Sequence, residues 1–325
     1  MDQTPIPGPI NVVRGLPPHV APSIRRTSSL LLTPDPRWFD GLRLVARARD
    51  LVVHPDGRCE VVDALSVRIG IDQASTVATI EGPVPELARE IVGTRVVAGF
   101  RAMLSELYRA GLDENSLTAA LLDDLPTVRL IAGYAHIMES PPKDAPHGSP
   151  RIDICAGWAR DGTAHRRAVS DGILVAPTPA APGIDDMIAD PIDFHVEPPN
   201  VPGSMRRRRI LEVSRGGGEL HVLQYFRDSH IDRSGREGAL HEYLMTVVAD
   251  PDEAGTVRDL DVQARTLPFP ECPLAVGYSG ELVGLPLAQA SRGVPDRLVG
   301  PHSCTHLNDT LRYLRFVPAL GRRTG

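Results

Sequence analysis

Four stretches of the chain alternate hydrophobic and polar residues with a period of two, which is the pattern of β-strands. Within each half, a short polar stretch containing glycine separates two of them, as in a β-hairpin. The predicted strands are residues 42–54, 60–72, 220–231 and 239–249. The pattern therefore predicts two long hairpins, one in each half of the chain.

Apolar residues at helical spacing predict helices at residues 84–108, 116–124 and 305–316. In the last of these, Leu307, Leu311 and Leu314 fall on one face. Strands and helices do not alternate along the chain as they do in a parallel doubly wound sheet. We therefore predict an α+β fold with mostly antiparallel sheets.

Proline-rich stretches divide the chain into four parts. Residues 1–23 are predicted to be a flexible arm, and residues 139–204 a connector with a short β insertion at "RIDICAGWARDGTAHRRAV". The two remaining parts, residues 24–138 and 205–325, are of similar length. Each is predicted to be an α+β unit.

The two units share a pattern. Without a gap, "LRLVARARDLVVHPDGRCEVVDALSVRIGID" (42–72) aligns with "LHVLQYFRDSHIDRSGREGALHEYLMTVVAD" (220–250). Both are followed by Thr-Val, then by "IVG" or "LVG", then by a helix start, "SLTAALLDDL" or "SCTHLNDTL". We predict an internal duplication, with a pseudo-twofold axis and a pocket between the repeats.

Composition narrows the functional classes. The chain has 325 residues, a net charge of −6 and 42% hydrophobic residues, which suffice for one large or two medium domains. A mildly acidic chain without long basic runs does not suit a nucleic-acid partner. Its four cysteines form no C-x-x-C pair, the start lacks an apolar signal core, and no apolar run is long enough for a membrane. We expect a cytoplasmic protein without a membrane partner, with a homodimer as its candidate assembly.

Functional side chains concentrate in the second unit. His241 aligns with Asp63, Glu242 with Ala64 and Tyr243 with Leu65. In the helix starts, Cys304 aligns with Leu117 and His306 with Ala119. If one unit is scaffold and the other active, the second is the active one.

Two hypotheses describe acid–base or nucleophilic chemistry there. His241 and Glu242 lie on a strand that is apolar on both faces, so each needs a partner or a shifted pKa. Cys304 precedes the last helix, where the helix dipole favours a thiolate. His306 or His302 is then the candidate base, with Asp309 or Glu242 orienting it.

Structural alternatives exist for the same residues. His241 and Glu242 suit a satisfied core histidine and an ion pair with Arg227 or with one of Arg206–Arg209. Ser303 or Thr305 suits a helix cap, with Cys304 as a small buried side chain.

The same cysteine and histidine residues can instead be interpreted as a metal site. In an extended segment, Cys304 and His306 project to the same side and can chelate one ion. Cys272 and His241 complete a Cys2His2 set, whose ligands suit zinc. Zinc is therefore the candidate cofactor.

Arginines supply the candidate contacts to an anionic substrate. Strand alternation sends two of the four residues 206–209 to each side. Arg206, Arg208 and Arg227, with Tyr243, are predicted to bind the substrate. The dipeptide Arg227-Asp228 recurs as Arg49-Asp50, which we interpret as a structural ion pair.

The motifs "RARDL", "LLDDLP", "CAGW", "FRDS", "HEY", "ECP" and "GPHSCTHLNDTLR" resemble the bacterial domain-of-unknown-function family 2889. The resemblance extends from about Arg25 to Leu320. Shorter members resemble the second unit alone, with a histidine near His241, a cysteine near Cys272 and the C-T-H-L signature. This implies that the second unit is the ancestral one. The family carries no settled reaction, and its shorter members have "GCTHL" where this chain has "HSCTHL".

These patterns favour a small-molecule enzyme of lyase, hydratase or hydrolase type, acting on a small anionic or phenolic substrate with possible help from zinc. In the lyase form of this hypothesis, Glu242 or His241 removes a proton, and an arginine or metal stabilises the oxyanion. The alternative is a non-catalytic binding or assembly protein with a structural His/Cys metal site.

Overall fold

The computed structural model describes residues 8–38, 40–139, 152–171, 176 and 178–324. Eight strands form one sheet. They are β1 (Ser23–Pro34), β2 (Gly41–Val53), β3 (Cys59–Asp72), β4 (Val77–Glu81), β5 (Ser204–Gly216), β6 (Glu219–Ile231), β7 (Glu237–Ala249) and β8 (Val257–Thr266). The α+β class and the antiparallel sheet are therefore confirmed.

The strand order is β4-β3-β2-β1-β5-β6-β7-β8, so the two halves of the chain share one sheet. They meet where β1 pairs antiparallel with β5, at the centre. One buried apolar cluster also includes residues of both halves, among them Leu30, Leu121, Leu211 and Leu307. The halves are thus joined by backbone hydrogen bonds as well as by side-chain packing.

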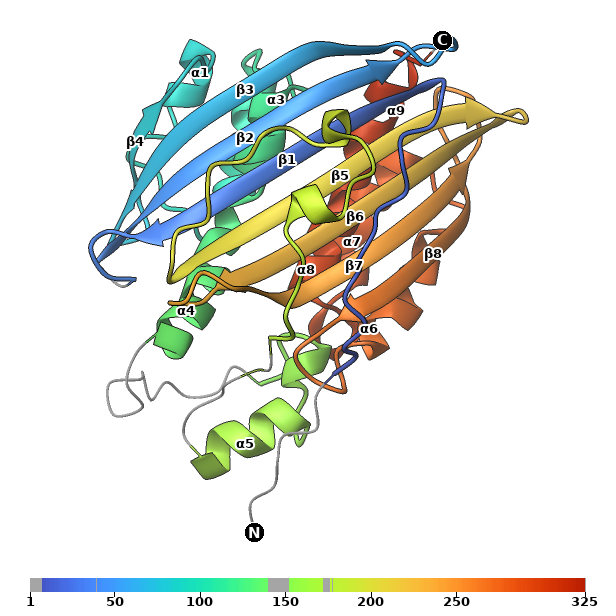
Figure 1. The fold of residues 1–325 in the computed structure, drawn as a ribbon. Coiled ribbons are helices and arrows are strands. Elements are labelled where there is room, and N and C mark those ends of the chain that lie inside the picture. The colour runs from blue at the N-terminus through green and yellow to red at the C-terminus, as the bar shows by residue number, and fades with distance from the viewer. Residues whose placement is uncertain (1–7, 39, 140–151, 172–175, 177, 325) are drawn as a thin grey trace.

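The helices are α1 (Glu86–Arg89), α2 (Phe100–Arg109), α3 (Leu117–Asp123), α4 (Leu125–Glu139), α5 (Thr163–Asp171), α6 (Leu274–Gly277), α7 (Leu287–Arg297), α8 (Thr305–Arg312) and α9 (Val317–Gly321). Figure 1 shows α3, α4, α7, α8 and α9 behind the sheet. We call this side the helix face. Two extended segments, residues 8–22 and 178–203, cross the front of the sheet (Figure 1). We call that side the strap face.

The two halves correspond strand by strand. Asp50 pairs with Asp63 across β2 and β3, and Asp228 pairs with His241 across β6 and β7. A register shift follows each aspartate. The β3–β4 pairing also shifts between Gly70 and Ile71, and the β7–β8 pairing shifts at the corresponding place, between Val248 and Ala249, with one further shift after Glu242. The "VG" glycines also correspond, since Gly93 N–H donates to Val77 O and Gly284 N–H to Val257 O, both at 2.8 Å. The predicted alignment of the hairpins therefore matches the register, while descent from a duplication stays a prediction.

The helix starts correspond with a shift of one residue from the predicted alignment. Ala120 N–H donates to Ser116 O in α3, and Asn308 N–H donates to Cys304 O in α8. Ser116 and Cys304 are the N-cap residues of these helices. Cys304 therefore occupies the place of Ser116, and His306 that of Thr118.

The predicted arm is held against the sheet over its described part. Ile10 bridges to Thr266, Val13 N–H donates to Glu242 Oε2 at 2.8 Å, and Leu16 is buried. Residues 1–7 lie outside the described part of the chain. The proline-rich composition of this segment leaves no hydrophobic periodicity from which its packing could be predicted. The segment nevertheless packs on the sheet, because groups of the sheet form hydrogen bonds with its backbone.

The connector also differs from expectation. A short β insertion was predicted, but the described residues 152–171 contain the 3-10 turn η2 (Ala156–Trp158) and α5. Within "TAHRRAVSD", which follows Gly162, the two alanines and two arginines have high helix propensity and favour the helix. Thr163 N–H and Oγ1 donate to Glu271 Oε1 at 2.7 and 2.8 Å, which attaches α5 to the second half.

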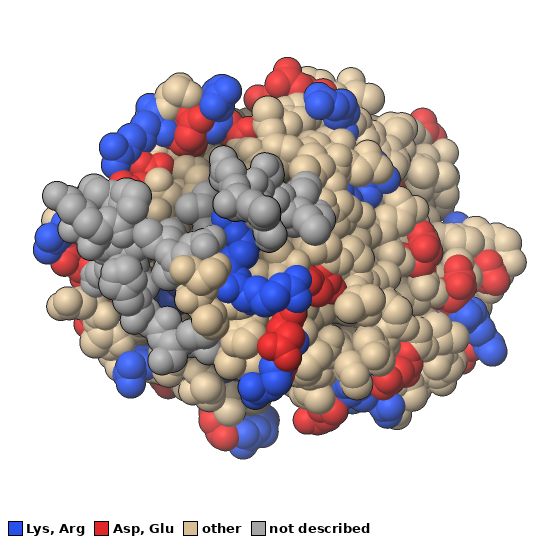
Figure 2. Space-filling model, turned by 90° about the horizontal axis from the view of Figure 1, so that it is seen from below, with Lys and Arg blue, Asp and Glu red and all other residues tan. Residues whose placement is uncertain are grey.

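No helix in the described part of the chain is long and apolar enough to cross a membrane. Figure 2 shows the molecule from below, where acidic and basic side chains are interspersed among uncharged ones.

Candidate functional site

The candidate site lies on the helix face of the second half. Asp228 on β6 and His241 on β7 are register partners, so their side chains project to the same side of the sheet. His306 lies in the first turn of α8 and meets them from the helix layer. The sheet register and the start of one helix therefore bring together residues that are far apart in the sequence.

The two imidazoles stack. The ring centroids of His241 and His306 are 3.5 Å apart with an angle of 16° between the planes, and the side chains are buried. Nδ1 of His241 and Nε2 of His306 have no hydrogen-bond partner. A buried polar atom left without a partner costs about 1–3 kcal/mol, so this arrangement is unfavourable for an empty site.

Burial keeps both imidazoles neutral. It lowers the pKa of His241 well below 6.5, and the neighbouring His306 lowers it further. Burial likewise lowers the pKa of His306, to which the positive charges of Arg207 and Arg209 add. At neutral pH, each ring therefore offers one nitrogen lone pair.

Asp228 connects the pair to a buried arginine. Arg207 donates Nε–H to Oδ1 at 2.8 Å and Nη2–H to Oδ2 at 2.9 Å. Nε2 of His306 lies 3.5 Å from Oδ2. Asp228, His241 and His306 each offer a ligand atom, and these atoms lie within 4.8 Å of one another.

Cys304 and Tyr243 lie beside the pair. Tyr243 O–H donates to Cys304 Sγ at 3.2 Å, and Sγ lies 3.9 Å from Nδ1 of His306. Burial raises the pKa of the Cys304 thiol, although the N–H groups of His306 and Leu307 at the helix start act in the opposite direction. The electrostatics thus do not favour the thiolate expected from the helix position.

The Cys2His2 set is not assembled as one ligand group. In the part of the chain that the structure describes, the group with ligand atoms within 4.8 Å consists of Asp228, His241 and His306, and neither Cys304 nor Cys272 belongs to it. Cys272 is buried beside Gly157, and burial raises the pKa of its thiol. Only two of the four predicted metal ligands therefore lie in this group.

Asp309 belongs to a neighbouring ion-pair network. It accepts from Arg101 at 2.8 Å and from Arg207 at 3.3 Å. Arg207 and Arg209 also donate to Asp124 from the first half. Asp309 thus contacts the candidate site through Arg207, and its two ion pairs are with Arg101 and Arg207 rather than with an imidazole.

Glu242 and three predicted substrate contacts lie on the strap face. Arg206 and Arg208 pair with Glu197, and Arg208 and Arg227 pair with Glu237. Glu242 lies 3.5 Å from Arg227 and accepts from Tyr225 O–H at 2.8 Å, while burial raises its pKa. Because alternate residues of a strand point to opposite faces, the sheet separates these four residues from the histidine pair.

The Arg-Asp dipeptides are not internal ion pairs. Asp50 receives two hydrogen bonds from Arg26 at 2.8 and 2.9 Å, and Asp228 receives two from Arg207. Arg227 faces the straps, where it contacts Glu237. The aspartates are structural, but their partners are the arginines of the two central strands. Alternation along β5 and β6 is the sequence signal that could have placed Arg207 and Asp228 on the same face of the sheet.

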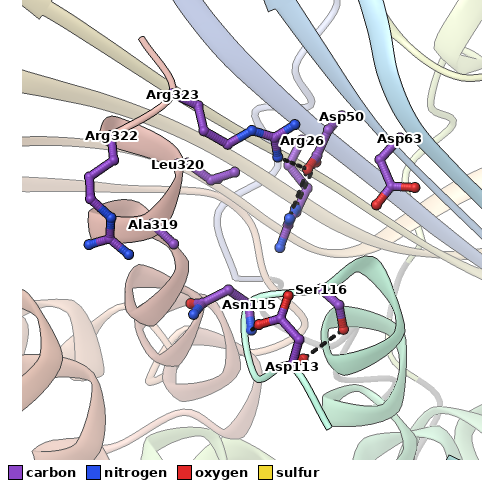
Figure 3. A pocket seen from close by; sticks show the side chains of 10 residues that line it. All are labelled: Arg26, Asp50, Asp63, Asp113, Asn115, Ser116, Ala319, Leu320, Arg322 and Arg323. Carbon is purple, nitrogen blue, oxygen red and sulfur yellow. Dashed lines mark hydrogen bonds and ion pairs between the residues drawn. The ribbon is translucent and has the colours of Figure 1, made fainter. Parts of the chain in front are cut away.

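The corresponding place in the first half is a cavity of about 320 Å³. Figure 3 shows Arg26, Asp50, Asp63 and Ser116 around it, where the second half has Arg207, Asp228, His241 and Cys304. Nη1 of Arg26 has no hydrogen-bond partner there. A second cavity of about 760 Å³ lies beside His230 and Glu237. The histidine pair lines neither of these two cavities.

Residues 204–319 match the model of a family described as a protein of unknown function (DUF2889). The match covers β5 to the start of α9, and so includes Asp228, His241, Cys304 and His306. It confirms the resemblance for the second half of the chain. No curated protein and no solved structure matches this chain.

Proposed function

We propose that the second half, which matches DUF2889, carries a small-molecule enzyme site of acid–base type, in the lyase, hydratase or hydrolase class. The reacting groups are Asp228, His241, Tyr243, Cys304 and His306, which we call the helix-face cluster. The difference between the halves supports this proposal. The first half forms the same strands and helix start with Asp63, Ser116 and Thr118, so the architecture alone does not require two buried imidazoles.

The cluster suits proton transfer. A neutral imidazole accepts a proton, and Asp228, 3.5 Å from Nε2 of His306, stabilises the imidazolium that forms. Burial raises the pKa of Tyr243 well above 10, so its hydroxyl stays protonated and can donate to a developing oxyanion. The substrate remains the small anionic or phenolic compound expected from the sequence. Arg206, Arg208 and Arg227 take no part in binding it, because they lie on the other face.

The histidine pair is buried and lines neither of the two cavities described above, and we propose that a substrate reaches it by displacing a covering segment. We assign this role to residues 152–171. They contact the cluster's surroundings through Ala156 N–H, which donates to Ser303 O at 2.8 Å, and through Gly157 against Cys272. Thr163 and Glu271 then act as the second attachment of the cover.

The test is an untargeted one, because the substrate is unknown. Purified wild-type protein and the variant His306→Ala are incubated with a small-molecule extract, and consumed and produced ions are followed by mass spectrometry. We expect at least one substrate–product pair that depends on His306, with Arg208→Lys on the strap face as the matched control. Turnover that is equal in the His306→Ala protein would rule out the cluster as the site.

The alternative is a non-catalytic binding or assembly protein. The observation that favours it is the burial of the cluster, since buried polar groups also serve structural purposes. It predicts that the His306→Ala protein is less stable and that no ion in the extract is consumed by the wild type. A cytoplasmic location stays a prediction, with which the four free cysteines are consistent. Assembly as a homodimer also stays a prediction.

A further inference from the structure

We propose that Asp228, His241 and His306 bind one divalent transition-metal ion between β6, β7 and the start of α8. The inference goes beyond the proposed function, because the ion binds whether or not the site turns over a substrate. It also replaces the Cys2His2 set expected from the sequence with a set of two imidazoles and one carboxylate.

The donor atoms are close enough for a shared ion. All three lie within 4.8 Å of one another, and Nε2 of His306 is 3.5 Å from Oδ2 of Asp228. Metal–nitrogen and metal–oxygen distances near 2.1 Å hold two ligands about 3–4 Å apart, so small adjustments suffice. The two rings stack nearly parallel with their centroids 3.5 Å apart, so we expect metal binding to tilt one of them.

Two unpartnered nitrogens point to the missing ligand. Nδ1 of His241 and Nε2 of His306 are enclosed and lack hydrogen bonds, and both residues belong to the group whose donor atoms converge. A bound ion gives each of them a partner.

The surroundings orient the ligands. Arg207 fixes the Asp228 carboxylate with two hydrogen bonds. Cys304 Sγ lies 3.9 Å from Nδ1 of His306, so a proton on Nδ1 points to sulfur and the lone pair on Nε2 is left for the ion. Tyr243 in turn donates to the same sulfur. The cysteine thus positions a metal ligand without being one.

The arginines near the proposed ion are paired with carboxylates, which compensate their positive charges. Arg207 pairs with Asp124, Asp228 and Asp309, and Arg209 pairs with Asp124. Two imidazoles and one carboxylate are a ligand set typical of catalytic zinc and of non-haem iron(II), with positions left for water or substrate. The first half has Asp63 and Thr118 in the places of the two histidines, so we infer one ion per chain.

The full-length protein, purified without chelator, tests the proposal by elemental analysis. We expect one equivalent of a divalent transition metal, or its uptake by chelator-treated protein titrated with Zn²⁺ or Co²⁺. The Co²⁺ form should lack the near-ultraviolet charge-transfer band of a cobalt–thiolate bond. Wild-type protein that neither contains nor takes up either ion overturns the proposal, and this result does not depend on a variant that folds.

Matched variants locate the ion. His306→Ala and His241→Ala should lose it, whereas Cys304→Ser and Cys272→Ser should retain it. Loss of the ion from either cysteine variant, or a cobalt–thiolate band in the wild type, overturns the ligand set in favour of the cysteine-containing one. Metal binding without any His306-dependent turnover contradicts the proposed function alone. His306-dependent turnover by a protein that neither contains nor takes up the metal contradicts this inference alone.

Discussion

Arg207 on β5 and Asp228 on β6 form a buried pair of two parallel hydrogen bonds on the helix face, at 2.8 and 2.9 Å. Removing the arginine leaves a carboxylate enclosed without its cation. We expect Arg207→Leu to lower the free energy of unfolding by about 3–5 kcal/mol, measured by chemical denaturation.

The first half supplies the comparison for this prediction. Arg26→Leu removes the same two bonds from Asp50, but Asp50 also contacts the exposed Arg323 at 3.1 Å. The loss should therefore be smaller than for Arg207→Leu. Arg258→Leu, in the exposed pair with Asp250, is the control and should change stability little. If all three substitutions lowered the free energy of unfolding equally, burial of the ion pair would not determine how much it stabilises the protein.

Acid should destabilise the metal-free protein through its enclosed histidines. In the unfolded chain, His241 and His306 take up a proton as the pH falls through 6.5, but their folded-state pKa values lie well below that. The unfolded state thus binds more protons, and stability falls as the pH drops below 6.5. The unfolding free energy measured by chemical denaturation should therefore decrease between about pH 7 and pH 5.

His195 should add to the same acid sensitivity. Burial, together with nearby arginines, lowers its pKa to about 3, and its two ring nitrogens contact Thr27 and Ser29. His306→Gln should make the pH dependence of the unfolding free energy shallower, whereas His221→Gln, at an exposed histidine, should not. An unchanged slope in the His306→Gln protein would contradict the neutral folded state.

Gly157 should be hard to replace. A Cβ atom there would lie 2.6 Å from Cys272 Sγ and 3.4 Å from a ring carbon of Phe269. Gly157→Ala should therefore destabilise the protein by about 1–3 kcal/mol, with part of the loss recovered by Cys272→Ala. Gly133→Ala in α4, where the new Cβ meets nothing within 4 Å, should be neutral or stabilising. Failure of Cys272→Ala to recover stability would place the strain elsewhere.

The thiols should differ in reactivity. Burial raises the pKa of all three thiols, Cys59, Cys272 and Cys304, but Cys59 is partly exposed whereas the other two are buried. Labelling of the native protein, mapped by mass spectrometry, should modify Cys59 well before Cys272 and Cys304. Fast labelling of Cys304 would instead support the activated thiolate that its position suggested.

The hairpins were predictable because alternation and glycine turns are local signals. Residues 42–54 and 239–249 were expected as strands, and the structure has them as Gly41–Val53 and Glu237–Ala249. The predicted helix at 84–108 divides into α1 and α2, because Gly93 and Gly99 have φ of +88° and +94°.

The central strands could not be recognised in this way. β1 and β5 carry "RRT" and "RRRR" in the middle of the sheet, buried on both faces. Their charges are compensated by Asp124, Asp193 and Glu197, which lie elsewhere in the sequence. A pattern that compares neighbours along the chain contains no information about such partners.

The candidate site was predictable in part. Comparison of the halves identified His241, Cys304 and His306, and the structure brings these three together. It did not identify Asp228, because an aspartate with a counterpart in the other half was interpreted as structural only. Arg227 and Glu242 were grouped with the histidines by sequence distance, but strand alternation places them on the strap face.

The pairing of β1 with β5 has a consequence for the second half on its own. Ser28 and Arg209 are opposite each other at the middle of this junction, with Arg26 and Arg207 two residues before them on either strand. A fragment starting at Ser204, where the family match begins, would expose the N–H and C=O groups of β5 as an open edge. Two such fragments joined through their β5 edges would restore eight continuous strands, so the linked chain carries within itself a contact that separate copies would have to find by collision.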